Sequence, residues 1–388
     1  MEGTTRRRFL LQCCYCAFAC AGMKTVEWAA TCRASRAQTL QKGFLGHKLS
    51  PYFTRLKGEK IRCELCPRRC EVDDGERGYC RVRVNEKGRY YSLAYGNPCA
   101  VHVDPIEKKP FFHVLPGTLS FSIATAGCNL DCKFCQNWEI SQTRPDDTTN
   151  YSLSPREVVE YAVKNRCVSI ASTYVEPTIF TEYMIDIGEL ARKHRVLKVM
   201  HSSGFINIPP LDDLCKVLNA ACIDLKGFTE DYYRDLTEGS LEPVLNTLKR
   251  LKQLQVHTEI VNLVVPGKND DMEKIRSMCR WIRDELGAEV PLHFSRFYPL
   301  YKLKSLEPTP VATLERAWKT ATEEGLRFVY IGNVPGRPEE NTFCPKCRAC
   351  VIERNGYRVK AFRLTDGRCQ ACGQSIPGIW ELPDAEKI

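Results

Sequence analysis

The sequence predicts an α/β fold, a partial (β/α) TIM-like barrel with small cysteine-rich modules at its N- and C-terminal ends. Between about residues 96 and 335, short apolar runs alternate with segments of helical periodicity. Such alternation is typical of parallel strands joined by crossover helices. Cys-x2-Cys pairs lie on both sides of this region. A chain of 388 residues is long enough for one large domain with such appendages.

The expected elements follow from hydrophobic periodicity. Buried strands are predicted at residues 121–124, 168–171, 197–200, 221–225, 259–265, 292–294 and 328–331. Helices are predicted from residue 155 and at 177–195, 211–219, 244–254, 272–286 and 312–324. The first helix has a strong start signal, because Ser154 is followed by Pro155 and, three residues after the Ser, by Glu157.

Four segments are predicted from these changes of pattern. They are a leader (1–37), an N-terminal cysteine-rich module (38–95), the core barrel (96–335) and a C-terminal module (336–388). The leader contains a twin-arginine-type sequence from Thr5 to Leu10 and an apolar run from Phe9 to Met23. That run is too short for a stable membrane span, so we expect none. A chance basic N-terminus is the alternative to a true leader.

Composition narrows the function classes. The net charge of +9 is modest for this length, and no long basic run or basic–aromatic ladder is present, so a nucleic-acid partner is not expected. Twenty-two cysteines is a high count. Their grouping in Cys-x2-Cys pairs on a long chain favours metal sites.

The cysteines that follow the first predicted strand are the main candidates for catalysis. Cys128, Cys132 and Cys135 have a C-x3-C-x2-C spacing, which fits three thiolates around one [4Fe–4S] cluster. Three ligands leave one iron with open positions, where chemistry can occur. The alternative is a zinc knuckle or buried thiols, but a structural zinc site usually has four ligands. In barrels of this class the carboxyl ends of the strands carry the active site.

Each flanking module contains a cysteine quartet. The N-terminal quartet is predicted to hold zinc or a second cluster, and the spacing does not choose between them; it consists of Cys63, Cys66, Cys70 and Cys80. The C-terminal quartet is predicted to form a zinc-ribbon-like structural site, with Cys350 able to replace one ligand; it consists of Cys344, Cys347, Cys369 and Cys372.

The sequence resembles the radical S-adenosylmethionine (SAM) superfamily. Within it the chain is similar to pyruvate formate-lyase activating enzymes, and more closely to AmmeMemoRadiSam-system radical SAM enzymes. The motifs that carry this resemblance are CELCPRRC, GCNLDCKFCQNWEISQ, TYVEPTIFTEY, DLKGF, PGKND, PLHFSRFYP and VYIGNVPG. The resemblance implies that SAM binds the open iron. One electron then cleaves it to methionine and a 5′-deoxyadenosyl radical, which abstracts a hydrogen atom.

The resemblance also implies cofactor-binding residues at the strand ends. Tyr174 and Glu176 stand in place of a Gly-Gly-Glu segment that binds the SAM amino group, although a charge at a helix N-terminus also explains Glu176. Lys226 is expected at the SAM carboxylate and Asp224 near a bound cation; a buried ion pair is the alternative.

Two further pairs are weaker candidates. His201 and Ser203 end the third predicted strand, where the family usually has Thr-Asn-Gly, and they are expected to face SAM. His293 and Arg296 are expected to contact the SAM ribose, its adenine or the substrate. A strand histidine that is satisfied within the core is the alternative for His293.

The predicted function is therefore that of a radical SAM oxidoreductase with a [4Fe–4S] cluster, SAM and structural zinc. The expected partners are a low-potential electron donor, such as a ferredoxin or flavodoxin, and a protein substrate attacked at a glycine Cα. SAM and low-potential electron donors are found in the cytoplasm, which places the protein there. The predicted leader instead indicates export to the periplasm. Two alternatives remain open, an exported iron–sulfur electron-transfer protein and a zinc-dependent binding module.

Overall fold

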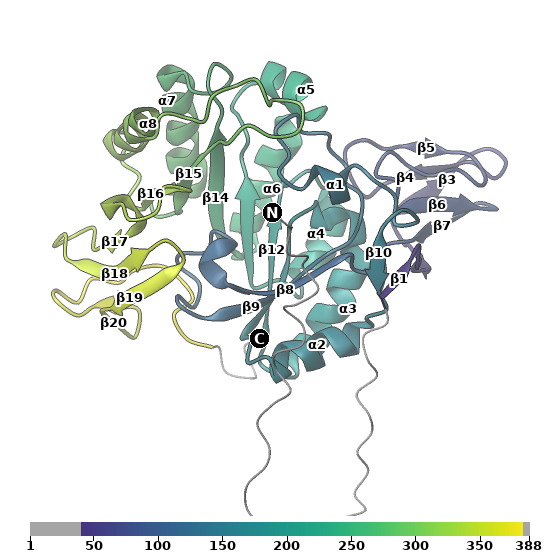
Figure 1. Cartoon of the computed structure of the whole chain (residues 1–388), viewed down its shortest axis with the longest axis horizontal. Helices are drawn as coiled ribbons and strands as arrows, with labels where there is room; N and C mark the ends of the chain where they lie inside the picture. Colours follow the sequence, from purple (N-terminus) through teal and green to yellow (C-terminus); the bar gives the residue numbers. More distant parts are fainter. Residues whose placement is uncertain (1–39, 383–388) are drawn as a thin grey trace, which may run out of the picture. The chain divides into compact units, whose positions relative to one another are not determined.

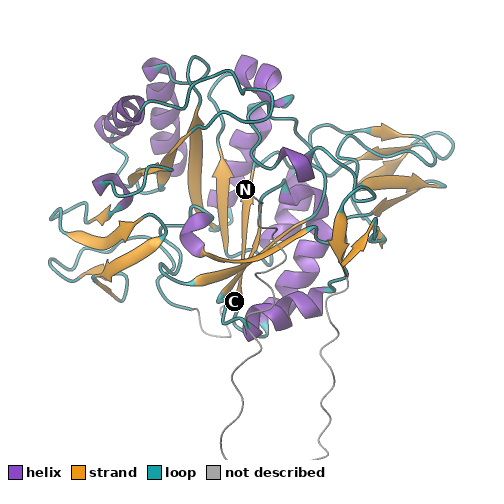
Figure 2. Cartoon of the chain, in the orientation of Figure 1, coloured by secondary structure: helices purple, strands orange, loops and turns teal. Residues whose placement is uncertain are grey.

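The computed structural model describes residues 40–382, so the predicted leader lies outside the described residues. Its centre is an eight-stranded sheet (Figures 1 and 2). In spatial order the strands are β16 (Val329–Gly332), β15 (Leu292–Arg296), β14 (His257–Val264), β13 (Ala220–Asp224), β12 (Leu197–Ser202), β11 (Ser169–Ser172), β9 (Leu119–Ala124) and β8 (Ala100–Pro105). All seven predicted strands are present, with ends shifted by a few residues.

The seven predicted strands run parallel, and β8 alone is antiparallel to its neighbour β9. The sheet is not closed, because β16 and β8 are its two edges. We did not predict β8. Its sequence carries exposed His102 and Val103 and ends in a proline, which is tolerated at an edge. The observed sheet is compatible with a partial barrel.

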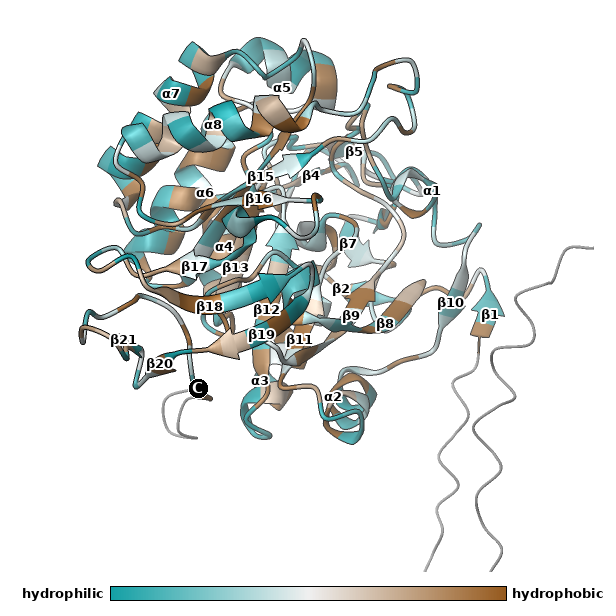
Figure 3. Cartoon of the chain, turned by 60° about the vertical axis from the view of Figure 1, so that its left-hand side comes forward, coloured by the Kyte–Doolittle hydropathy of each residue, from teal (hydrophilic) through white to brown (hydrophobic). Residues whose placement is uncertain are grey.

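Helices connect the parallel strands. They are α2 (Pro155–Lys164), α3 (Thr181–Arg192), α4 (Ile208–Cys215), α5 (Glu230–Thr237), α6 (Glu242–Gln253), α7 (Met272–Trp281) and α8 (Val311–Glu323). The predicted capping box of α2 is present, since Ser154 accepts from the Glu157 N–H and the Glu157 carboxylate accepts from the Ser154 N–H. Figure 3 shows helices such as α7 and α8 with one polar and one apolar face, as helices covering a sheet require.

Two helix predictions need correction, and one helix was not predicted. The segment 177–195 does not begin as an α-helix, because Pro177–Phe180 (η3) is a 3-10 turn that leads into α3. The end of 272–286 is a π-helical turn, Ile282–Leu286 (η4). The helix α5, capped by Thr229, was not predicted; its tyrosines, which are buried, broke the expected pattern.

The segment between β8 and β9 fills the concave side of the sheet. It begins with a 3-10 turn, Ile106–Lys108 (η2), and its apolar side chains pack on inward-facing residues of the strands. The buried cluster consists of Ile106, Phe111, Val114, Leu115, Ala171, Leu197, Val199, Ala220, Cys222 and Val261. The interior is therefore a packed core away from the carboxyl ends of the strands.

Two small β modules flank this core in Figure 1. The N-terminal one contains β2 (Lys48–Leu49), β3 (Phe53–Arg55), β4 (Ile61–Cys63), β5 (Glu71–Val72), β6 (Arg83–Glu86) and β7 (Arg89–Ser92). The C-terminal one contains β17 (Thr342–Phe343), β18 (Cys350–Asn355), β19 (Arg358–Phe362), β20 (Leu364–Thr365) and β21 (Arg368–Cys369). In these modules β6 pairs with β7, and β18 with β19, as antiparallel neighbours.

The remaining elements are short. The strand β1 (Leu40–Lys42) pairs with β10 (Thr149–Tyr151), a four-residue helix α1 spans Trp138–Ser141, and a 3-10 turn η5 spans Pro338–Glu340. Among residues 40–382, none of the helices has the length and apolar character that crossing a membrane requires. The domain boundaries after residues 95 and 335 stay predictions.

Candidate functional site

The three cysteines of the C-x3-C-x2-C motif lie on one loop that leaves the carboxyl end of β9. Cys132 is buried, while Cys128 and Cys135 are partly exposed, and all three are free thiols. The Leu130 N–H points at Cys128 Sγ (3.4 Å), and Cys135 Sγ lies 3.3 Å from Ser141 Oγ. Three thiols on one loop, with hydrogen-bond donors turned toward sulfur, form a donor set that fits an iron–sulfur cluster.

This cysteine loop is tied to the neighbouring strand ends. The side-chain amide of Asn137 donates to the Tyr174 carbonyl (2.7 Å), just beyond β11. The amide of Gln142 donates back to the Leu130 carbonyl (3.0 Å). These bonds fix the loop over the carboxyl ends of the parallel strands.

Glu176 is buried and joins the ends of β11 and β12. Its carboxylate accepts from Ser202 Oγ (2.6 Å), from Ser203 N–H (2.7 Å) and from Ser203 Oγ (2.5 Å). It also caps η3 by accepting from the Thr178 N–H (3.0 Å). The structure thus brings Glu176 and Ser203 together. It also agrees with the alternative for Glu176, because this charge lies at the N-terminus of a short 3-10 turn.

His201, Asp224 and Lys226 form a chain of ionic contacts at the ends of β12 and β13. His201 Nε2 lies 2.8 Å from Asp224 Oδ1, and Lys226 Nζ donates to Asp224 Oδ2 (2.8 Å). Burial opposes ionisation of Asp224, but the charges of Lys226 and His201 outweigh it and hold the pKa of this carboxyl well below its usual range. Burial alone would lower the pKa of Lys226, but the negative charge of Asp224 outweighs burial and raises this pKa. The lysine is therefore charged.

These side chains lie within electrostatic reach of the cysteine loop. Burial raises the pKa of Cys132 to about 12, and the positive charge of Lys226 opposes that rise. Burial raises the pKa of Cys128 well above its usual range, and the negative charge of Glu176 adds to it. The thiols of Cys128 and Cys132 are therefore protonated near neutral pH, and a bound metal would have to displace those two protons.

Tyr174 has a left-handed backbone, with φ of +69°. Glycine adopts this conformation easily. In the Gly-Gly-Glu segment of the superfamily that this chain resembles, a glycine stands at this position. The tyrosine is held by its hydroxyl, which donates to Asp104 and accepts from Lys109 Nζ (3.0 Å). The backbone at this strand end therefore has a conformation typical of glycine, although the residue is a tyrosine.

The structure does not bring the fourth pair, His293 and Arg296, into this group. His293 is buried, with Nε2 2.7 Å from Glu259 Oε2, and its ring stacks on Tyr330. Arg296 donates to the Thr309 carbonyl (2.8 Å). The contacts of His293 favour the alternative of a satisfied core residue.

Several residues that support the site were not predicted. Asn269 donates to the Lys226 carbonyl (2.7 Å). Tyr233, on the unpredicted α5, accepts from the Lys226 N–H (3.1 Å). Asn137 lies within the quoted cysteine motif. The Asn269 contact joins residues 43 positions apart, and the Tyr233 contact depends on the unpredicted helix α5.

The C-terminal cysteine quartet is gathered as a single-metal site. The sulfur atoms of Cys344, Cys347, Cys369 and Cys372 all lie within 4.8 Å of one another, and two pairs are 3.6 and 3.7 Å apart. Tetrahedral zinc, with Zn–S bonds of about 2.3 Å, needs sulfur atoms about 3.8 Å apart. This group could therefore hold one metal ion. Cys350 is not part of it; its thiol points at the Ile352 carbonyl.

The N-terminal cysteine quartet is arranged differently. Cys63, Cys66, Cys70 and Cys80 are free thiols that line one small cavity. Within residues 40–382, the C-terminal quartet is the one group of three or more potential metal ligands that is drawn together at single-ion spacing.

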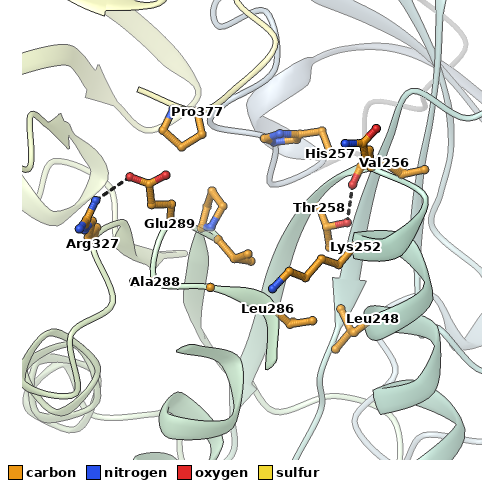
Figure 4. A pocket seen from close by; sticks show the side chains of 14 residues that line it. Leu248, Lys252, Val256, His257, Thr258, Leu286, Ala288, Glu289, Arg327 and Pro377 are labelled. Carbon is orange, nitrogen blue, oxygen red and sulfur yellow. Dashed lines mark hydrogen bonds and ion pairs between the residues drawn. The ribbon is translucent and has the colours of Figure 1, made fainter. Parts of the chain in front are cut away.

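A separate hollow lies at the opposite ends of the strands (Figure 4). It is lined by residues where β14 and β15 begin, including His257 and Pro291, and by Lys252. In Figure 4 Arg327 faces Glu289, with 2.7 Å between their charged atoms. Active sites in barrels of this kind lie at the carboxyl ends of the strands, so we keep this hollow apart from the candidate site.

Comparison with known proteins agrees with the geometry of the cysteine loop. Residues 122–279 match the family model of the radical SAM superfamily. The chain is 45% identical over 327 residues to the uncharacterized protein MJ0808 of Methanocaldococcus jannaschii, covering 84% of this chain and 97% of that protein. It is 23% identical over 219 residues to the pyruvate formate-lyase 1-activating enzyme of Escherichia coli K12, covering 53% and 89%.

Solved structures also align with the chain. A radical SAM methyltransferase from Sphaerobacter thermophilus aligns with a TM-score of 0.45 and 15% identity, covering 58% of this chain and 70% of that one. The family model spans the cysteine loop and the strand ends that carry Glu176, Asp224 and Lys226. The chain belongs to the radical SAM superfamily, whose enzymes use SAM and a [4Fe–4S] cluster.

Proposed function

We propose that this protein is a radical SAM oxidoreductase that abstracts a hydrogen atom from a partner protein. The observation that carries this proposal is the group of opposite charges around three free thiols. Glu176 lies within electrostatic reach of Cys128, and Lys226 within reach of Cys132, at the carboxyl ends of the parallel strands β11 and β13, with β12 between them. An amino acid, with one cationic and one anionic end, is the chemical class that such a pair complements.

In this proposal Cys128, Cys132 and Cys135 hold a [4Fe–4S] cluster. With SAM and one electron it supplies methionine and a 5′-deoxyadenosyl radical, which takes a hydrogen atom from the substrate. The chain's own residues bind and orient SAM. Lys226 attracts the SAM carboxylate as a point charge, and Asp224 and His201 fix the position of that lysine.

The amino group of SAM is assigned to the neighbouring strand ends. Glu176 supplies the negative charge, Ser203 orients its carboxylate, and the left-handed backbone at Tyr174 allows close approach. We leave His293 and Arg296 as candidates for substrate contact only, because their observed partners lie outside this group.

The proposed substrate class and partners follow from likeness alone. The pyruvate formate-lyase 1-activating enzyme is named for a protein that it activates, which favours a polypeptide substrate here. A ferredoxin or flavodoxin would supply the electron, and a zinc ion in the C-terminal quartet would serve structure.

The test uses the full chain, reconstituted with iron and sulfide without oxygen. With dithionite and SAM, we expect 5′-deoxyadenosine from the wild-type protein and none above background from Cys132→Ala. Cys215→Ala is the matched control, because Cys215 is a free, partly exposed thiol on α4, and it should keep full activity. Iron incorporation without cleavage of SAM in the wild-type protein would favour the electron-transfer alternative, and zinc without iron would favour the binding module.

A further inference from the structure

The N-terminal cysteine quartet surrounds a space between the stretch 63–70 and the turn before β6. Cys63 ends β4, Cys66 lies in the following turn, Cys70 precedes β5 and Cys80 precedes β6. The Cys63 N–H donates to the Cys70 carbonyl (2.8 Å), which fixes the first and third cysteines side by side. All four line one small cavity that opens in part to solvent.

The sulfur spacing argues against a single ion. A zinc ion draws four sulfur atoms to about 3.8 Å from one another, and the C-terminal quartet has this spacing. In a cubane cluster each thiolate binds a different iron, so the thiolates stand farther apart. The N-terminal quartet does not form a single-ion group, and in this it matches the three-cysteine loop.

The wall of the cavity has unused polar groups. The Tyr90 hydroxyl and Arg83 Nε are buried without a hydrogen-bond partner, and both residues line the cavity. Both side chains are fully buried. A hydroxyl and a guanidinium N–H are donors from which cluster sulfur can accept hydrogen bonds.

On one side of the cavity, close packing leaves no room for a side chain at Gly78. A Cβ at Gly78 would lie 2.9 Å from the Tyr90 hydroxyl and 3.8 Å from both Cys70 Cβ and Cys70 Sγ. Gly78 does not have a positive φ, so its turn does not require glycine. The Tyr90 hydroxyl, only 2.9 Å from the position of that Cβ, is what favours glycine here.

The quartet also abuts the loop of the candidate active site. A Cβ at Gly127, next to Cys128, would lie 2.4 Å from the Cys80 carbonyl, and Asn129 lines the cavity. Arg68, between Cys66 and Cys70, donates to the Asn129 carbonyl (2.5 Å). The two cysteine groups therefore share a backbone contact.

We propose that Cys63, Cys66, Cys70 and Cys80 hold a second, closed [4Fe–4S] cluster beside the loop of Cys128, Cys132 and Cys135. A cluster with four protein thiolates has no open iron and cannot bind SAM, so its chemistry is one-electron transfer. This proposal does not rest on the proposed function, because it concerns ligands outside the cysteine loop.

The test removes the ligands of the cluster proposed for the cysteine loop, so that any remaining iron must be bound elsewhere. The full chain carrying Cys128→Ala, Cys132→Ala and Cys135→Ala is reconstituted without oxygen, and its iron, sulfide and zinc are counted. We expect about four iron atoms per chain, in a cubane by Mössbauer spectroscopy, and about one zinc. No iron above background, with about two zinc atoms per chain, would overturn the proposal.

A second variant keeps the test decisive. Adding Cys66→Ala to the triple variant should remove the remaining iron and leave the zinc. Adding Cys347→Ala instead, in the C-terminal quartet, should lower the zinc and leave the iron. Iron that survives Cys66→Ala would show that other residues bind it and would equally overturn the proposal.

Discussion

The two flanking modules each bring four cysteines to a small β structure, yet they differ in spacing and in attachment. The C-terminal quartet is drawn to single-ion distances, and the N-terminal quartet lines a cavity. Each module is also anchored by one buried arginine. Arg83 pairs with the buried carboxylate of Glu182 on α3 (2.5 Å), whereas Arg354 donates to the Phe112 carbonyl (2.7 Å) and to Thr342 Oγ1 (2.8 Å).

The difference between the modules teaches how similar cysteine motifs reach different sites. The C-terminal ligands come from two Cys-x2-Cys pairs that a hairpin brings face to face, so one ion closes the site. The N-terminal ligands come from the stretch 63–70 and from Cys80, around two buried polar atoms without a hydrogen-bond partner, Arg83 Nε and the Tyr90 hydroxyl. We propose that the room between the sulfur atoms, more than the motif, determines which metal group each quartet would hold.

Removing the C-terminal ligands should have the largest effect. Cys344→Ser with Cys372→Ser should lower zinc by about one atom per chain and unfold that module, because a structural zinc supplies about 10 kcal/mol or more of apparent folding free energy. Metal analysis and limited proteolysis measure this. Cys350→Ser is the control and should keep the zinc. Iron lost together with the zinc would contradict the distinction between the modules.

Removing the N-terminal anchor should cost less. Arg83→Met leaves the Glu182 carboxylate buried without its cation, which should lower the free energy of unfolding by about 3–5 kcal/mol. The matched exposed pair Arg363–Glu353 (3.2 Å) lies in the C-terminal module, and Arg363→Met should cost less than about 1 kcal/mol. Denaturant unfolding compares the two, and equal costs would mean that Arg83 is not an anchor.

Changing Lys226 should affect SAM binding at the cysteine loop and leave the metal content of the two quartets unchanged. Lys226→Met removes a charged partner for the SAM carboxylate, worth about 1.5–3 kcal/mol, or roughly 10- to 150-fold in SAM affinity. Equilibrium binding to the reconstituted protein measures it. Iron and zinc counts should stay unchanged, and a loss of iron would show instead that this lysine supports a cluster.

The smallest effect is expected at the wall of the N-terminal cavity. Tyr90→Phe removes one buried hydroxyl, and changes of this kind beside a metal site lower metal affinity by about 10-fold. Competition with an iron chelator measures it in the triple variant that lacks the loop cysteines. Tyr357→Phe changes an exposed tyrosine of the other module and should have no effect.

Much of the core could be predicted because its strands are continuous apolar runs and its helices carry ordinary start signals. The strand β8 could not, since its antiparallel pairing with β9 depends on tertiary contacts. The site was partly predictable. Asp224 and Lys226 lie two residues apart, but the contact of His201 with Asp224 joins two strands. Likewise the Arg83–Glu182 pair, which attaches a whole module, joins residues 99 positions apart.

The most direct test of the account is electron paramagnetic resonance of the full chain, reduced with dithionite, with and without SAM. We predict signals from two reduced clusters, of which SAM changes one. Cys132→Ala should leave the signal that SAM does not change. A single signal that SAM changes completely would contradict the cluster assigned to the N-terminal quartet, and signals that SAM leaves unchanged would contradict the proposed function.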